Sequence, residues 1–261
     1  MRKQFDEKYS SLFYEAIKAD LERFAKDITD KGPSAALSML GAYAWNEDMM
    51  TIMRMLYRDA AISFGNASYR AVGIMSRKAS NPFGLNSSLI KEITAYLTQY
   101  GFYLIANITQ TTKKKLNDLV TNAINQGMTI EDIARLITNE DQLSYGKTRA
   151  RVISRTEVMR SSNYAALIGA AKHPFEVDKV WISRRDNRTR RIPPGVYDHV
   201  DMDGQTVAYG EKFKSRDAYG RLIEAEIPGD PVTPAGFTIN CRCTVGFVPR
   251  RDSNGSLIMK R

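Results

Sequence analysis

Apolar residues recur at helical spacing through the first two thirds of the chain. From Leu12 to Phe24 they return mostly every three or four residues, until Lys31-Gly32-Pro33 interrupts the pattern. A second stretch, rich in methionine, runs from Met49 to Phe64. We interpret it as core or inter-subunit packing, because methionine adapts to irregular apolar surroundings. The pattern predicts helices over about residues 4–171, with short interruptions only.

Several side chains predict where individual helices begin. Asn46, Thr129 and Ser144 are each placed to cap a helix N-terminus, and Asp132 follows Thr129 by three residues. Between Asn46 and Thr129 we expect one helix that begins at about Leu89. A separate helix is expected to open at Lys113-Lys114-Lys115 and to end at Gly127.

The sequence changes character at Pro174. Seven of the nine prolines lie between residues 174 and 249, and roughly alternating segments predict strands over residues 175–183, 211–214 and 237–248. The expected fold class is therefore α+β. We expect a long α-helical domain over residues 1–143, a compact α+β domain over 144–250 and a tail over 251–261. Residues 144–250 are expected to fold without the helical domain.

Charge is distributed unevenly. Residues 51–200 hold 22 Lys and Arg against 12 Asp and Glu. Such a balance favours a nucleic acid or an acidic protein as partner, and an ordinary solvated surface explains it equally well. The candidate contacts with nucleic acid are Lys113, Lys114, Lys115, Arg184, Arg185, Arg188, Arg190 and Arg191.

Two further classes of segment are not expected. The chain has no uncharged apolar run of about 18 residues, the length that suggests a transmembrane helix. Residues 1–8 lack the apolar core of a signal peptide. We therefore expect no membrane span, and synthesis and first use in the cytoplasm.

The only two cysteines, Cys241 and Cys243, are separated by one residue, and His199 lies upstream. A bridge between the cysteines would close a small strained ring. Zinc accepts sulfur, nitrogen and oxygen ligands in tetrahedral geometry, so these three residues with Asp186 could form a zinc site. The alternatives are a metal-free, hydrogen-bonded module and a cysteine–histidine nucleophile pair. We expect the metal-free module.

Polar side chains also mark the helix that ends near residue 171. Thr156 and Asn163, seven residues apart, share one face, whereas Arg155 and Glu157 point about 200° apart. We expect these groups to hydrogen-bond the loops that follow, with a catalytic glutamate as the alternative.

Several motifs occur in a fixed order after this helix, which includes Ile153-Ser154-Arg155-Thr156-Glu157. They are Trp181-x4-Asp186-x-Arg188-Thr189-Arg190, Asp198-His199, Asp203-Gly204, Pro228-Gly229-Asp230-Pro231 and Asn240-Cys241-Arg242-Cys243. Together, over about residues 149–249, they resemble the phage Mu protein F-like family of minor head proteins. Many members carry a Cys-x-x-Cys pair after the aspartate. Arg190 stands where its first cysteine would be.

The resemblance implies a structural, non-enzymatic minor head protein of a tailed bacteriophage. Such a protein would lie inside the capsid at the portal vertex and act in head morphogenesis and DNA packaging or ejection. Its partners would be the portal protein, packaged double-stranded DNA, and a scaffold or major capsid protein. It would be found in the host cytoplasm during assembly and afterwards in the virion.

The resemblance also assigns structural roles to individual residues. Arginines of residues 184–191 would pair with Glu224, Glu226 or Asp230. The structural motif would comprise Arg155, Glu157, Asp186, Arg188, His199, Asp230, Asn240, Cys241 and Cys243. We expect no cofactor, because the Cys-x-x-Cys pair that many members carry is missing here, and zinc remains the alternative.

Two other function classes are kept as alternatives. A metal- or thiol-dependent nucleic-acid-processing or toxin-like enzyme would need a complete set of catalytic groups, and the sequence offers no obvious one. A simple DNA-binding protein is disfavoured, because no helix-turn-helix or zinc-finger motif is present.

Overall fold

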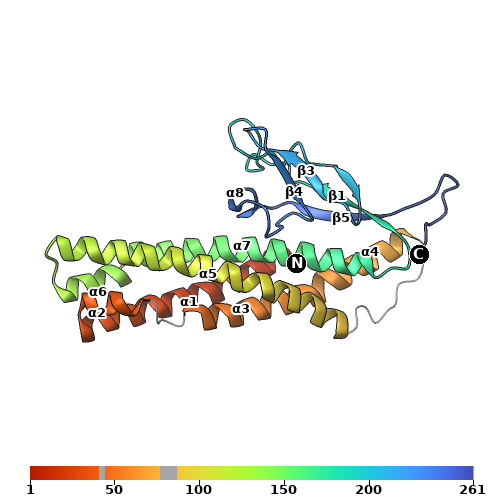
Figure 1. Cartoon of the computed structure of the whole chain (residues 1–261). Coiled ribbons are helices and arrows are strands. Elements are labelled where there is room, and N and C mark those ends of the chain that lie inside the picture. The colour runs from red at the N-terminus through yellow and green to blue at the C-terminus, as the bar shows by residue number, and fades with distance from the viewer. Residues whose placement is uncertain (41–44, 77–86, 261) are drawn as a thin grey trace. The chain divides into compact units, whose positions relative to one another are not determined.

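The computed structural model describes residues 1–40, 45–76 and 87–260, and the chain divides into two compact units. The first comprises Met1, Lys3–Met55 and Thr98–Ser154; the second comprises Arg2, Leu56–Leu97 and Arg155–Arg261. Both units are discontinuous in sequence, because four helices each contribute residues to both. Figure 1 shows the long helices and the small sheets that make up the chain.

The first unit is built from helices. It contains most of α1 (Arg2–Lys31), then α2 (Pro33–Met39) and α6 (Ile130–Thr138), and parts of α3 (Trp45–Ala60), α5 (Ser87–Asn125) and α7 (Glu140–Ala171). The helical spacing read from residues 12–24 gives one buried face of α1. Buried residues of this core include Tyr9, Phe13, Leu21, Phe24, Ile28, Met49, Met53, Val120, Ile133 and Ile137.

The capping predictions have mixed outcomes. Thr129 is the N-cap of α6, as predicted, and its hydroxyl accepts the N–H of Asp132 at 3.1 Å. Ser144 is not an N-cap, because α7 begins at Glu140 and the side chain of Asn139 accepts the N–H of Gln142 at 3.0 Å. Asn46 likewise lies inside α3, which begins at Trp45.

The predicted helix start at Lys113–Lys115 is wrong. α5 is one continuous helix from Ser87 to Asn125, so the lysines lie in its interior. A lone glycine, Gly101, weakens a helix but does not end it, and no proline interrupts these residues.

The second unit combines helix and sheet. It contains a π-helical segment (Ala61–Gly65), α4 (Asn66–Met75), α8 (Ala235–Thr238) and the C-terminal half of α7. An antiparallel sheet has the order β2-β1-β5, formed by Thr206–Ala208, Val177–Ile182 and Thr244–Pro249, and β3 (Phe213–Arg216) pairs with β4 (Leu222–Ala225). The α+β fold class is therefore confirmed.

Buried and partly exposed side chains alternate along β1, so one face of the strand contributes to the core of this unit. Val177, Lys179 and Trp181 are buried on one face of the strand, in register with Pro249, Phe247 and Val245 of β5. The prediction of a strand over residues 237–248 is partly wrong, because Phe237 and Thr238 end the short helix α8. Strands β2 and β4 were not predicted, because strands of three or four residues carry too little alternation to be recognised.

A close approach of two glycines joins the π-helical segment (Ala61–Gly65) to α7. A Cβ atom on Gly169 would lie 2.2 Å from the carbonyl oxygen of Gly65. His173 lies just beyond α7, where its ring stacks between Tyr69 and Phe175. The predicted boundary at residue 143 falls inside α7, and independent folding of residues 144–250 stays a prediction. Of the helices that the structure describes, none combines the length and apolarity that crossing a membrane requires.

Candidate functional site: a buried His–Cys–Cys cluster and its polar braces

The structure brings His199, Cys241 and Cys243 together in the core of the second unit. The Nδ1 atom of His199 lies 3.4 Å from each of the two Sγ atoms. All three side chains are almost completely buried, with at most 2% of their surface exposed. The cysteines are free thiols, held side by side because the N–H of Cys243 donates to Sγ of Cys241.

Aromatic rings surround the imidazole of His199. The ring meets Trp181 edge-on at a centroid distance of 5.5 Å and Phe237 at 4.3 Å. Its second nitrogen, Nε2, is buried and has no hydrogen-bond partner among the described residues. The N–H of His199 donates to the carbonyl of Arg190 at 2.9 Å, which fixes the loop that carries the ring.

The two thiols differ in acidity. A hydrogen bond from the side chain of Cys243 holds the pKa of the Cys241 thiol well below its usual value, and His199 acts in the same direction. The same bond and burial raise the pKa of Cys243. Cys243 therefore keeps its proton, and Cys241 is the sulfur on which negative charge is favoured.

Asp186 lies outside this cluster. Arg242 binds both of its carboxylate oxygens, Nη2 reaching Oδ1 at 2.5 Å and Nη1 reaching Oδ2. The backbone N–H of Arg188 and the hydroxyl of Thr189 also donate to this carboxylate. The Arg242 guanidinium, which makes the largest contribution, holds the pKa of Asp186 well below its usual range. Asp186 thus braces its own loop, and the proposed fourth metal ligand is already engaged.

Polar residues of α7 hold the loop before the Cys-x-Cys segment. Arg155 donates to the Oδ1 atom of Asn240 at 3.1 Å, and the hydroxyl of Thr156 accepts the N–H of Asn240 at 2.9 Å. The Nδ2 group of Asn163 donates to the carbonyls of Pro228 and Cys243 at 2.8 and 3.2 Å. These contacts are structural, and they tie both Cys-x-Cys and the Pro228 turn to one helix face.

Glu157 forms a buried ion pair on the same helix. Its carboxylate accepts a bond of 2.5 Å from Arg160 and one of 2.9 Å from the hydroxyl of Tyr57. Arg160 also donates through Nε to the carbonyl of Gly229 at 2.8 Å. Both oxygens of the Glu157 carboxylate are thus bound by protein groups, and the residue is 3% exposed. This arrangement favours the structural interpretation over a catalytic glutamate.

The expected pairing of arginines 184–191 with acids of the later loops is wrong. Glu226 pairs instead with the buried Lys179 at 2.5 Å, and Glu224 pairs with Lys214 at 3.6 Å. Asp230 accepts the backbone N–H groups of Glu226 and Val232, at 2.7 and 3.1 Å. Its carboxylate closes the turn locally, because these donors are amides of its own loop.

The candidate nucleic-acid contacts are divided between the two units, the lysines in the first and the arginines in the second. Lys115 lies over the ring of Tyr145, whereas Lys114 is exposed. In the second unit Arg185 pairs with Asp203, Arg190 donates to the carbonyl of Ile239, and Arg191 donates to that of Asp186. No ion pair to the side chain of Arg184 or Arg188 is found in the part of the chain that the structure describes, and both are exposed.

The cluster supplies three of the four ligands that a structural zinc site needs. An ion bonded at about 2.3 Å to sulfur and about 2.0 Å to nitrogen holds those atoms about 3.5 Å apart, close to the observed 3.4 Å. Nδ1 is the ring nitrogen that faces both sulfurs, so it would be the coordinating atom. However, structural zinc takes four ligands, and within residues 1–40, 45–76 and 87–260 no fourth His, Cys or carboxylate joins the group.

We expect the protein to hold clearly less than one zinc ion per chain, because the fourth ligand is missing. Elemental analysis of protein purified without a histidine tag measures the ratio. Cys243→Ser, which removes one of the three ligands, serves as the comparison and is expected to contain as little zinc as the natural chain. A ratio near one in the natural chain, lost in Cys243→Ser, would show that the cluster is a metal site.

Two residues that form these structural contacts, Lys179 and Arg242, were not identified from the sequence. Lys179 alternates with apolar neighbours on β1 and was expected to be part of an ordinary strand, yet it is completely buried. A signal existed, since a lysine on the inward face of a strand needs a buried partner. Arg242 lies between the two cysteines, and no separate role was expected for it.

Comparison with known proteins supports the family resemblance. The family model described as phage Mu protein F like protein matches residues 114–246, just over half of the chain. An uncharacterized protein of Bacillus subtilis (strain 168), YqbB, is 29% identical over 137 residues, which cover 52% of this chain and 42% of that protein. The chain thus spans less than half the length of this relative. No solved structure matches the chain. The family match includes the ion pair of α7, His199 and both cysteines, and the chain belongs to the phage Mu protein F-like family of phage head morphogenesis proteins.

Proposed function

We propose that the protein is a minor structural protein of the phage head that associates with the portal vertex inside the capsid. It would act there in head morphogenesis and in DNA packaging or ejection. The observation that carries the proposal is the family match over residues 114–246. The polar contacts around the His–Cys–Cys cluster support a structural role, because Asn163 and Asp186 brace its loops rather than line an open cleft.

Co-purification with the portal protein tests the portal assignment. The full chain and the portal protein of the same phage would be expressed together, with the tag on the portal protein. We expect a complex that survives gel filtration. Recovery of the portal protein alone, with this chain soluble in the flow-through, would contradict the assignment.

A thiol-dependent enzyme is the second candidate function. The low pKa of Cys241 and its contact with His199 favour it, since a thiolate beside an imidazole is a potential nucleophile. Burial opposes it, because Cys241 is only 2% exposed. Thiol reactivity separates the two candidates. A structural cluster leaves both thiols unreactive toward a disulfide reagent until the protein is denatured, whereas an accessible nucleophile reacts in the folded protein.

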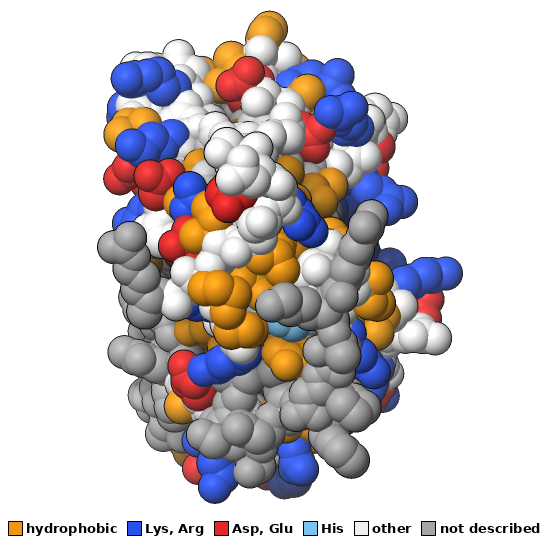
Figure 2. Space-filling view, turned by 90° about the vertical axis from the view of Figure 1, so that its right-hand side faces the viewer, with side chains coloured by type: hydrophobic (Ala, Val, Ile, Leu, Met, Phe, Trp, Pro, Cys, Tyr) orange, Lys and Arg blue, Asp and Glu red, His pale blue; other side chains and the backbone are white. Residues whose placement is uncertain are grey.

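The basic residues predict DNA binding that depends on salt and not on sequence. Figure 2 shows Lys and Arg side chains scattered among Asp and Glu over the face that it draws. Each phosphate contact contributes about 0.9 to the slope of log affinity against log salt. Arg184→Gln with Arg188→Gln is expected to lower the slope by up to about two.

The matched comparison is the triple change of Lys113, Lys114 and Lys115 to Gln. Because Lys115 lies over Tyr145, this change is expected to lower the slope by less per removed charge than the arginine pair does. Fluorescence anisotropy with a random-sequence duplex at several salt concentrations measures both. No binding even at about 50 mM salt would leave protein partners alone to explain the basic charge.

A further inference from the structure

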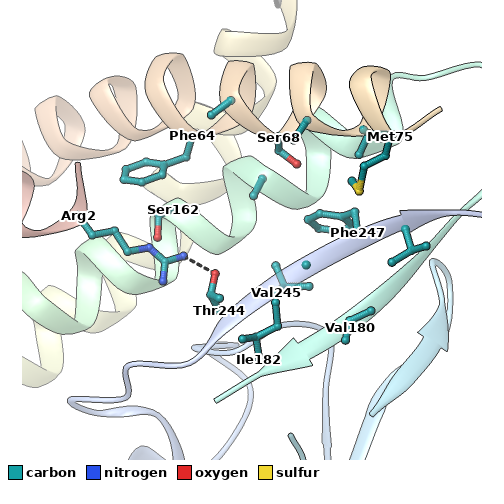
Figure 3. Close-up of a pocket in the computed structure, with 16 residues that line it drawn as sticks. Arg2, Phe64, Ser68, Met75, Ser162, Val180, Ile182, Thr244, Val245 and Phe247 are labelled. Atoms are coloured by element: carbon teal, nitrogen blue, oxygen red, sulfur yellow. Dashed lines mark hydrogen bonds between the residues drawn. The ribbon is translucent and has the colours of Figure 1, made fainter. Parts of the chain in front are cut away.

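A groove of about 630 Å³ lies in the second unit between α4 and the sheet strands β1 and β5. We call it the α4–β5 groove. Figure 3 shows Arg2 at one end and Met75 at the other, with Val180 and Ile182 pointing up from β1. Its volume is within the range of clefts that bind ligands, about 300–1,000 Å³. The groove is separate from the His–Cys–Cys cluster, whose side chains do not line it.

Apolar side chains at the groove remain open to solvent. Met75, Ile182 and Val248 line it, and each is 44% to 49% exposed. Ala71 of α4 is also exposed and faces the same space. Adjacent exposed apolar side chains of this kind mark sites where proteins or other apolar ligands bind.

Arg2 places a positive charge at one end of this apolar space. Its Nη2 atom donates to Oδ1 of Asn163 at 2.6 Å and to the hydroxyl of Thr244 at 2.9 Å, and its guanidinium lies 5.9 Å from the ring centre of Phe64. Both hydrogen-bond acceptors are neutral. Burial lowers the pKa of Arg2 to about 10, with the thiols of Cys241 and Cys243 acting in the opposite direction.

No carboxylate pairs with Arg2 in the described chain. Both of its hydrogen bonds are made by Nη2, so the N–H groups of Nη1 and Nε remain available to a ligand. A mostly buried cation without a carboxylate is costly, and charge complementarity favours an acidic group from outside. The carboxylate oxygens of a ligand match the fork of the guanidinium.

The edge of β5 offers backbone hydrogen bonds that a peptide can accept and the hydrocarbon chain of a fatty acid cannot. Trp181 donates its backbone N–H to Gln205 on the β2 side, and Trp181 faces Val245 across the ladder. In an antiparallel ladder this register turns the N–H and C=O groups of Val245 and Phe247 away from β1. Asn163 accepts the N–H of Val245 at 3.3 Å, while no group outside the sheet accepts that of Phe247 among the described residues.

We propose that the α4–β5 groove binds a peptide segment of another protein, in which an acidic side chain lies next to apolar ones. The carboxylate binds Arg2, the apolar side chains lie between α4 and the β1–β5 surface, and a main-chain carbonyl accepts the N–H of Phe247. A peptide is favoured over a fatty acid because only a peptide supplies that carbonyl. The proposal goes beyond the portal assignment, because the protein that supplies the peptide segment need not be the portal protein.

Selection from displayed random peptides tests this proposal with the full chain, kept free of any N-terminal tag. The Ala71→Phe variant fills the groove from an exposed position. Peptides that bind this variant would be removed first, and those that then bind the natural chain would be recovered. We expect the recovered peptides to carry Asp or Glu beside apolar residues. In anisotropy measurements Arg2→Gln is expected to weaken them by at least about tenfold, because a charged hydrogen bond is lost.

Arg70→Gln is the matched control, because it removes the same charge from α4 at an exposed position that does not line the groove. It is expected to leave the affinity unchanged, and Arg2→Lys is expected to keep part of it. Two results would overturn the proposal. One is a selection that yields no peptide dependent on an open groove. The other is laurate displacing an apolar dye from the groove while no peptide does so, which would assign the groove to a lipid. Portal co-purification is scored separately, so either proposal can fail while the other stands.

Discussion

Replacing Glu157 with Ala is expected to destabilise the second unit by about 3–5 kcal/mol, the usual cost of breaking a buried ion pair from one side. The change leaves the guanidinium of Arg160 without its carboxylate partner, and that side chain is 5% exposed. It also removes the acceptor of the Tyr57 hydroxyl. The expected effect is large because both remaining groups stay buried, where water cannot replace the lost contact.

Urea unfolding, followed by fluorescence in a Trp45→Phe background, measures this effect, since Trp181 then reports on the second unit alone. Tyr57→Phe removes a single hydrogen bond and is expected to cost about 1 kcal/mol. Glu224→Ala is the control, because that half-exposed ion pair with Lys214 contributes at most about 1 kcal/mol. Equal losses for Glu157→Ala and Glu224→Ala would show that the buried pair has no special role.

Gly169→Ala is expected to destabilise the same unit by about 3 kcal/mol or more, the upper part of the range for overpacking. The added Cβ would lie 2.2 Å from the carbonyl oxygen of Gly65 and 2.9 Å from its carbonyl carbon. Both atoms belong to the backbone, so the two helical segments must move apart. The gain in helix propensity, about 0.5–1 kcal/mol, is too small to offset this.

Gly146→Ala on the same helix is the matched control. There the added Cβ would meet only side-chain atoms, Cγ2 of Ile17 at 3.1 Å and Cε2 of Tyr14 at 4.0 Å, and the Ile17 side chain can shift by a few tenths of an ångström. Both variants gain the same helix propensity, so their difference isolates the backbone contact. Thermal unfolding is expected to show Gly146→Ala near the natural chain and Gly169→Ala well below it. Similar melting temperatures would mean that the approach of Gly65 and Gly169 contributes little.

The independent folding of residues 144–250 also depends on this contact. Gly65 belongs to the segment 56–97, which would be absent from such a fragment. Tyr57, the buried partner of Glu157, would be absent as well. The fragment prediction is therefore best tested beside the full chain, with amide dispersion in two-dimensional NMR as the measure.

The sequence by itself determined the fold class and the family. Helical spacing of apolar residues depends on neighbours three or four positions apart, and α1 follows it over its whole length. The Thr129 cap is equally local, because its hydroxyl bonds an amide three residues on. The ordered motifs from Trp181 to Cys243 identified the family for the same reason, since their spacing can be read along the chain.

The tertiary structure alone decided which charged and polar groups pair. Asp186 was a candidate metal ligand, and Arg242 binds it from 56 residues away. Glu226 was expected to face an arginine, and Lys179 of β1 binds it instead. Arg2 carried no signal in the sequence, yet it contacts Thr244 at the far end of the chain. Each of these pairings depends on where the loops and strands bring distant residues. Hydrophobic spacing does not encode that arrangement, because a buried charge is satisfied by whichever partner the fold places within reach.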